Sequence, residues 1–126
     1  ASRAYASPEA SDRALLRDHA DDPSIHFYFA RIAARHDDEV RLREQLSAMP
    51  SPPWPRPIIV PTYDLATKAR DPAKRREAVD ALVATVRDGP RCLRVRSQLE
   101  TWAEKAADAE TAAQIEERLA ELACVP

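Results

Sequence analysis

The chain has a single glycine, Gly89, and no asparagine among its 126 residues. Glycine and asparagine most readily adopt the positive φ angles that two-residue β-hairpin turns require. Their shortage therefore argues against a protein built from tight hairpins. It also excludes glycine-rich phosphate-binding loops, which need at least two glycines, and N-linked glycosylation, which needs asparagine. Aromatic residues are scarce as well, at 6% of the chain.

The residues that are abundant favour an all-α protein. Charged residues make up 32% of the chain, which is rich in Ala, Arg, Glu and Leu. The net charge of −2 argues against a generally basic nucleic-acid-binding protein. The charge is nevertheless segregated: residues 49–97 carry 10 basic and 5 acidic side chains, whereas residues 98–126 carry 2 basic and 7 acidic ones. A single helical domain, 1–126, is expected at this length, with residues 1–7 as a flexible lead.

No segment has the pattern of a membrane span or a cofactor site. The longest strongly apolar run, residues 58–60, is closed by proline on both sides. The first six residues are polar and contain no hydrophobic stretch of the kind found in signal peptides. We therefore expect no membrane span and no cofactor.

Several of the 11 prolines mark helix starts. Ser7-Pro8, Asp22-Pro23 and Asp71-Pro72 each place a capping side chain directly before a proline, as at a helix N-terminus. Gly89 is expected to end a helix. Apolar spacing then predicts helices at about 8–20, 23–35, 38–48, 62–70, 72–87, 91–106 and 110–123.

Six prolines fall within residues 50–61, which are expected to form a stiff extended connector. Two interpretations of its P-x-x-P spacing remain open. Either Trp54 and Ile59 are tucked into the core, which we favour, or the segment docks on a partner with Trp54 as an exposed contact.

The second predicted helix has more apolar side chains than one face can hold. Its spacing places Ile25, Tyr28, Phe29 and Ile32 on one face, which we expect to point into the core. Phe27 then falls elsewhere and is expected to be an exposed contact residue.

The short links after the second, fourth and sixth predicted helices indicate three antiparallel hairpins. Residues 103–119 resemble a tetratricopeptide unit across its inter-helix turn. Residues 71–82 resemble a HEAT repeat, in which an aspartate opens the second helix and an arginine follows four residues later, here Asp71 and Arg75. Asp37 and Arg41 have the same spacing. The predicted fold is thus an N-terminal helix plus three antiparallel hairpins, arranged either as a right-handed α-solenoid or as a compact bundle.

The two cysteines are placed symmetrically about the last predicted turn. Cys92 and Cys124 each lie 16 residues from Asp108. Positions equidistant from the turn of an antiparallel hairpin lie side by side, so a disulfide is predicted, with two buried thiols as the alternative. A bridge implies a bacterial periplasm or the extracellular space; free thiols imply the cytoplasm.

The three histidines give little support for catalysis. His19, His26 and His36 are 7 and 10 residues apart, whereas helical metal ligands fall three or four apart. Nearby aspartates fit helix starts better than an acid–base pair. No catalytic or metal-binding residue is therefore predicted.

The basic segment is the strongest candidate surface. It could form an anion-facing or partner-binding patch, or simply a solvated face. Its members are Lys74, Arg75, Arg76, Arg87, Arg91, Arg94 and Arg96.

These observations leave three hypotheses for the function. The leading one is a non-enzymatic protein-interaction or scaffold module, with an acidic protein as the candidate partner. The second is a self-associating structural or regulatory subunit in which the basic middle meets the acidic C-terminal hairpin, of another copy or of the same one. The third is a small enzyme or metal protein centred on His19, His26 and His36.

Overall fold

The computed structural model describes residues 10–86, 89–122 and 124. Over these residues the chain is all-α, as predicted, and contains no strand. The predicted lead, 1–7, and the Ser7-Pro8 helix start lie outside the described residues. The helices are α1 (Ala10–Asp18), α2 (Pro23–Arg35), α3 (Glu39–Ala48), α4 (Arg56–Lys68), α5 (Pro72–Val83), α6 (Gly89–Lys105) and α7 (Ala109–Glu121).

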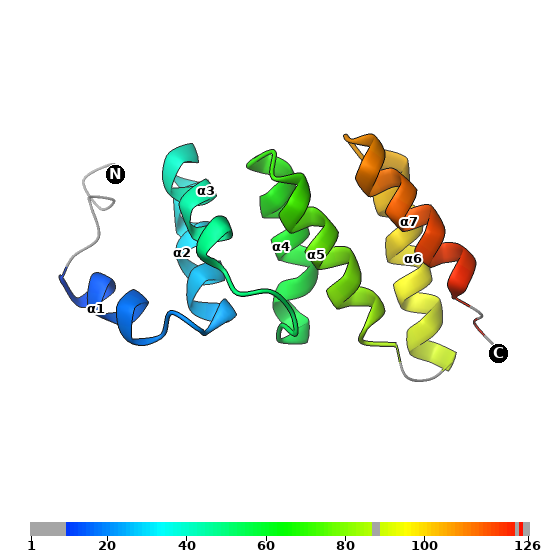
Figure 1. Ribbon diagram of the computed structural model, residues 1–126, viewed down its shortest axis with the longest axis horizontal. Coiled ribbons are helices and arrows are strands. Elements are labelled where there is room, and N and C mark those ends of the chain that lie inside the picture. The colour runs from blue at the N-terminus through cyan, green and yellow to red at the C-terminus, as the bar shows by residue number, and fades with distance from the viewer. Residues whose placement is uncertain (1–9, 87–88, 123, 125–126) are drawn as a thin grey trace.

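Six of the helices form three antiparallel hairpins, which confirms the predicted architecture (Figure 1). The pairs are α2 with α3, α4 with α5, and α6 with α7. The hairpins stand side by side in a row. α2 contacts α4 and α5 contacts α7, so α2, α4 and α6 form one layer and α3, α5 and α7 the other. α1 lies at the foot of α2 and runs away from the row (Figure 1).

Aspartates cap most of the helices. The side chain of the residue before α2, α3, α5 and α7 accepts a hydrogen bond from a backbone N–H in the first turn, at 2.8 to 3.1 Å. Such a cap stabilises a helix by about 1 kcal/mol. The four residues are Asp22, Asp38, Asp71 and Asp108.

Two hairpin turns adopt a positive φ angle without glycine. Asp37 has φ 53° and Arg70 has φ 55°. After α2 the N–H of Asp38 donates to the carbonyl of Ala33 at 2.9 Å, which completes a Schellman-type helix end. The turn after α4 repeats this arrangement around Arg70.

Gly89 does not end a helix, which corrects the prediction from its position. α5 already stops at Val83, and Gly89 is the first residue of α6. The chain leaves the helix early because Thr85 forms a tight turn: its hydroxyl donates to the carbonyl of Leu82 at 2.6 Å.

The proline-rich connector is shorter than predicted, because α4 begins at Arg56 and not near residue 62. Pro57 falls in the first helical turn, where no backbone N–H is needed, and Pro61 is tolerated inside the helix. The helix is anchored by Ile58 and Ile59, both of which are buried. Extended chain is therefore confined to the residues before Arg56.

The inward face of α2 is not the one that the spacing predicted. The buried side chains are His26, Phe27, Ala30, Ala33 and Ala34. The three alanines let neighbouring helices approach closely, and this close packing outweighs the larger side chains elsewhere on the helix.

Candidate functional site

Two members of the predicted basic patch are buried, which corrects their assignment to a surface. Lys74 and Arg75 are each only 5% exposed. The ammonium of Lys74 donates to the carbonyl of Met49 at 3.0 Å and pairs with Glu77 at 3.0 Å. Lys74 therefore makes internal contacts and is not part of an exposed basic surface.

The acidic C-terminal hairpin neutralises the basic helix within the same chain. Arg75 pairs with Asp108 at 2.7 Å, and Arg76 pairs with Glu110 at 3.0 Å, in both cases from α5 to α7. Arg118 of α7 pairs in return with Asp80 of α5 at 3.1 Å. The opposite charges of the two segments thus join the second hairpin to the third.

The Asp108 carboxylate carries two functions in this contact. Burial raises its pKa, but the backbone N–H of Thr111 and the guanidinium of Arg75 outweigh that effect, so the pKa lies below its usual value. Asp108 therefore stays ionised while it caps α7 and holds Arg75.

Two further basic residues bind backbone carbonyls beyond helix ends. Arg91 donates to the carbonyl of Thr85 at 3.2 Å, and Arg96 to that of Leu122 at 3.1 Å. Cations near helix C-termini complement the helix dipole. Of the remaining members, Arg94 is exposed and Arg87 lies outside the described residues. Among the described members, Lys74 and Arg75 are buried, and Arg76, Arg91 and Arg96 are engaged within the chain.

The histidines are not gathered into a cleft. His19 and His36 are exposed, whereas His26 is buried, with Nε2 donating to the carbonyl of Ala20 at 2.8 Å and Nδ1 3.0 Å from Oε1 of Gln45. His26 thereby ties the turn after α1 to the first hairpin. In the part of the chain that the structure describes, no cluster of His, Cys, Asp and Glu could hold a metal ion.

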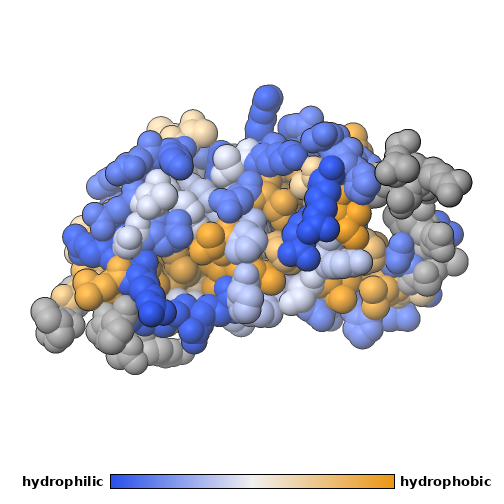
Figure 2. All heavy atoms as spheres, turned by 180° about the vertical axis from the view of Figure 1, so that it is seen from behind, coloured by the Kyte–Doolittle hydropathy of each residue, from blue (hydrophilic) through white to orange (hydrophobic). Residues whose placement is uncertain are grey.

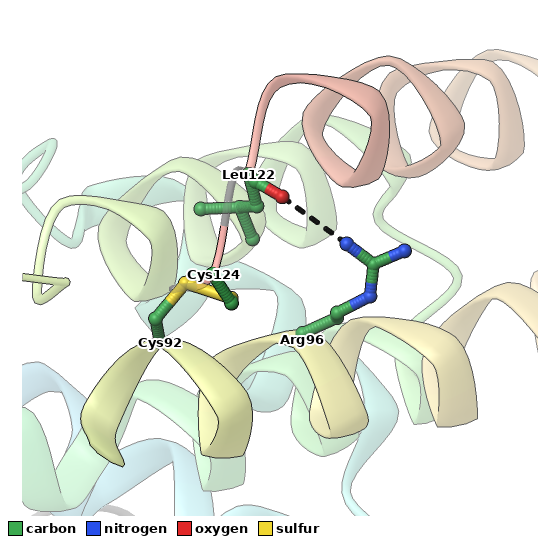
Figure 3. Close-up of a disulfide and its surroundings, with 4 residues drawn as sticks. All are labelled: Cys92, Arg96, Leu122 and Cys124. Atoms are coloured by element: carbon green, nitrogen blue, oxygen red, sulfur yellow. Dashed lines mark hydrogen bonds between the residues drawn. A yellow bond between two sulfur atoms is a disulfide. The ribbon is translucent and has the colours of Figure 1, made fainter. Parts of the chain in front are cut away.

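Cys92 and Cys124 form a disulfide, as their symmetric spacing predicted. It joins the start of α6 to the chain just after α7 (Figure 3). Arg96, one turn further along α6, reaches across to the carbonyl of Leu122 beside it. Together they close the open end of the last hairpin.

Both predicted aromatic contacts are buried, so those two assignments are wrong. Phe27 faces the core of the first hairpin, and the Arg31 guanidinium lies 5.4 Å from its ring centroid. Trp54 packs into the core and donates from Nε1 to the carbonyl of Pro50 at 2.8 Å. This confirms our favoured interpretation of the connector. Among the described residues, the exposed aromatic side chain is instead that of Tyr28, at 48%.

The layer formed by α2, α4 and α6 presents one face of the row. Figure 2 views the protein from this side and shows apolar side chains gathered across its middle and at the end where α1 and α2 lie. Leu93 on α6 is 55% exposed, and Val60 on α4 is partly buried. The same three helices carry exposed charges of both signs, including Arg31, Asp64 and Glu100. We call these five residues the outer face.

Two shallow hollows flank Arg70 at the edge where the first two hairpins turn. One has a volume of about 240 Å³ and the other about 350 Å³. Lys68 projects into the first and pairs with Asp37 at 3.3 Å. Three carboxylates and two cations line this hollow, Asp37, Asp38, Glu39, Lys68 and Arg70, so its net charge of −1 does not favour an anion.

Comparisons with protein-family models, curated proteins and solved structures give no significant match. The resemblance of residues 71–82 and 103–119 to HEAT and tetratricopeptide units therefore stays a prediction. No helix among the described residues combines the length and apolarity that crossing a membrane requires.

Proposed function

We propose that the protein is a non-enzymatic protein-binding module of the helical-repeat kind, which engages its partner through the outer face. One observation carries the proposal. Three hairpins present three parallel helices side by side, and their exposed side combines apolar side chains with charged ones. Protein interfaces are built from such a mixture, in which an apolar centre is surrounded by polar groups.

The ion pairs of the basic segment support the choice of the outer face as the binding surface. Lys74, Arg75 and Arg76 make ion pairs within the chain, so they are not available to an acidic partner. Arg31 and Glu100 on the outer face remain exposed. A partner with charges of both signs around an apolar strip fits this surface better than a uniformly acidic one.

The disulfide supports an oxidising compartment for this activity. A bridge between Cys92 and Cys124 persists in a periplasm or outside the cell and is rare in reducing cytoplasm. We therefore place the binding partner in the same compartment.

Capture experiments with two matched variants test the proposal. Leu93→Asp introduces a charge on the outer face, and Val40→Asp does so on α3, where Val40 is 68% exposed in the opposite layer. Wild type and both variants are immobilised and exposed to envelope extract of the native host, and the retained proteins are quantified by mass spectrometry.

A partner of the outer face is a protein that wild type and Val40→Asp retain and Leu93→Asp loses. It is then purified and titrated calorimetrically against all three proteins. If all three retain the same proteins in the same amounts, the outer face is not the binding surface and the proposal fails.

The structure favours the other two functions less. Self-association through opposite charges would need the basic segment and the acidic hairpin to be free, yet Arg75 and Arg118 pair with Asp108 and Asp80 of the same chain. Light scattering at low and high salt tests it. Catalysis by His19, His26 and His36 would need them close together, and they do not share a cleft.

A further inference from the structure

α2 carries a second apolar face that the core does not use. Ile25, Phe29 and Ile32 recur at helical spacing, and all three are only partly buried. Tyr28 stands at their edge, with its ring 5.1 Å from that of Phe29 in an edge-to-face arrangement. We call these four residues the outer stripe.

The outer stripe is separate from the hydrophobic core. Among the described residues, the partly buried side chains that pack against the core include Val60, Leu65 and Leu119 but none of the outer stripe. α1 reaches α2 only at its foot, and its own Leu15 and Leu16 remain partly exposed. The apolar side chains at this end of the row are visible in Figure 2.

The opposite end of the row is finished differently. The exposed positions of α7 are Ala109, Glu110, Ala113, Glu116, Glu117, Ala120 and Glu121. They are small or acidic, as expected of a terminal unit that faces water. Of α2 and α7, only α2 therefore carries a stripe of large apolar side chains that, among the described residues, lies outside the core cluster.

We propose that the outer stripe is the interface of a homodimer, in which the α2 helices of two copies pack antiparallel across a two-fold axis. Such an axis places the same surface of both copies in contact, so the surface must be complementary to itself. The stripe meets this condition. Its centre lies between Tyr28 and Phe29, so that Ile25 of one copy faces Ile32 of the other.

The charges at the two ends of α2 fit the same antiparallel pairing, in which Ile25 of one copy faces Ile32 of the other. Asp21 and Asp22 precede the helix, and Arg35 ends it. Antiparallel pairing about the stripe centre brings Asp22 of each copy next to Arg35 of the other, at both ends of the interface. A parallel arrangement would place like charges together, so the charge pattern selects the antiparallel one.

Sedimentation analysis of the purified protein over a wide concentration range tests the interface. We expect a dimer of the 14.1 kDa chain. Phe29→Lys should weaken dimerisation on the order of 100-fold or more, because each copy loses an apolar contact and gains a charge there. Val40→Lys, at an exposed apolar position of α3, should leave it unchanged. A wild-type protein that is monomeric at every concentration would overturn the proposal.

Cysteine pairing tests the register. Described cysteines are all engaged in the native disulfide, so introduced thiols report only on the interface. Ile25→Cys mixed with Ile32→Cys should form a covalent dimer on oxidation. Either variant alone should not, because residues 25 of the two copies would lie about 10 Å apart along the helix, beyond the reach of a disulfide. Crosslinking by either variant alone, or none in the mixture, contradicts this register.

This test needs no partner protein, and its variants change none of the five residues that define the outer face. A monomeric protein would leave the proposed binding function intact, and loss of capture by Leu93→Asp would say nothing about the dimer. The two proposals can therefore fail separately.

Discussion

Two ion pairs join α5 to the start of α7 and differ in burial. Arg75 and Asp108 lie 2.7 Å apart, and Arg76 and Glu110 lie 3.0 Å apart. The side chains of the first pair are 6% and 25% exposed, and those of the second are 34% and 79% exposed. We predict that the first pair contributes clearly more to stability, because water screens it less.

The perturbation is a double-mutant cycle for each pair. Arg75→Met keeps an apolar stem in the buried site, and Asp108→Asn removes the charge while retaining a side chain that caps α7 equally well. Arg76→Met and Glu110→Gln are the matched changes at the exposed pair. A hydrogen bond that involves charged groups contributes about 2 kcal/mol, which is the coupling expected for Arg75 and Asp108. An exposed ion pair contributes less than about 1 kcal/mol to stability, which is the coupling expected for Arg76 and Glu110.

Urea unfolding followed by circular dichroism gives the free energy of each variant, and the difference between double and single variants gives the coupling. The native disulfide is kept oxidised throughout. A coupling for the buried pair no larger than that of the exposed pair would refute the reasoning from burial.

The same variants make a prediction about pH. Because the pKa of Asp108 is lowered by folding, its contribution is fully present above the pKa of the unfolded chain, about 4. It is lost as the pH falls through the lowered value in the folded state. Wild type should therefore lose more stability than Asp108→Asn on acidification, and equal losses would contradict the assignment.

Three smaller predictions concern stability and use the same urea assay. Cys92→Ala with Cys124→Ala should lower the free energy of unfolding by about 4 kcal/mol, because the bridge spans 32 residues, and an unchanged midpoint would contradict this. Arg70→Gly should raise stability by about 1 kcal/mol by relieving a positive φ angle, whereas Arg70→Ala should not. Thr62→Val should raise it by about 1 kcal/mol, because among the described residues the buried hydroxyl finds no partner, and a loss would show that it has one.

Features that depend on nearby residues were predictable from the sequence. Asp22-Pro23 and Asp71-Pro72 mark helix starts because capping involves only the first turn. The disulfide followed from the equal distances of Cys92 and Cys124 from the last turn, since a hairpin is itself a local structure. The predicted start of α4 and end of α5 were wrong. For α4 the reason is that tertiary contacts decide whether Pro61 is tolerated inside a helix.

Features that depend on distant partners were not predictable. Arg75 looked like a surface charge because its partner, Asp108, is 33 residues away. The inward face of α2 was misassigned because both of its faces are apolar, and only the neighbours decide which is buried. Its alanines were the available signal: small residues such as Ala30 and Ala33 on one side of a helix permit close packing.

The two ends of the row of hairpins differ in the side chains that they expose. At the α7 end, a disulfide and the Arg96 hydrogen bond close the last hairpin, and the exposed positions of α7 are alanines and glutamates. At the α2 end it leaves Phe29 and Ile32 partly exposed and joins α1 through the His26 contact to Ala20. Among the described residues, the apolar side chains of the outer stripe lie outside the core cluster, whereas the exposed positions of α7 are small or acidic. This contrast is the physical reason to expect that a second molecule contacts the α2 end.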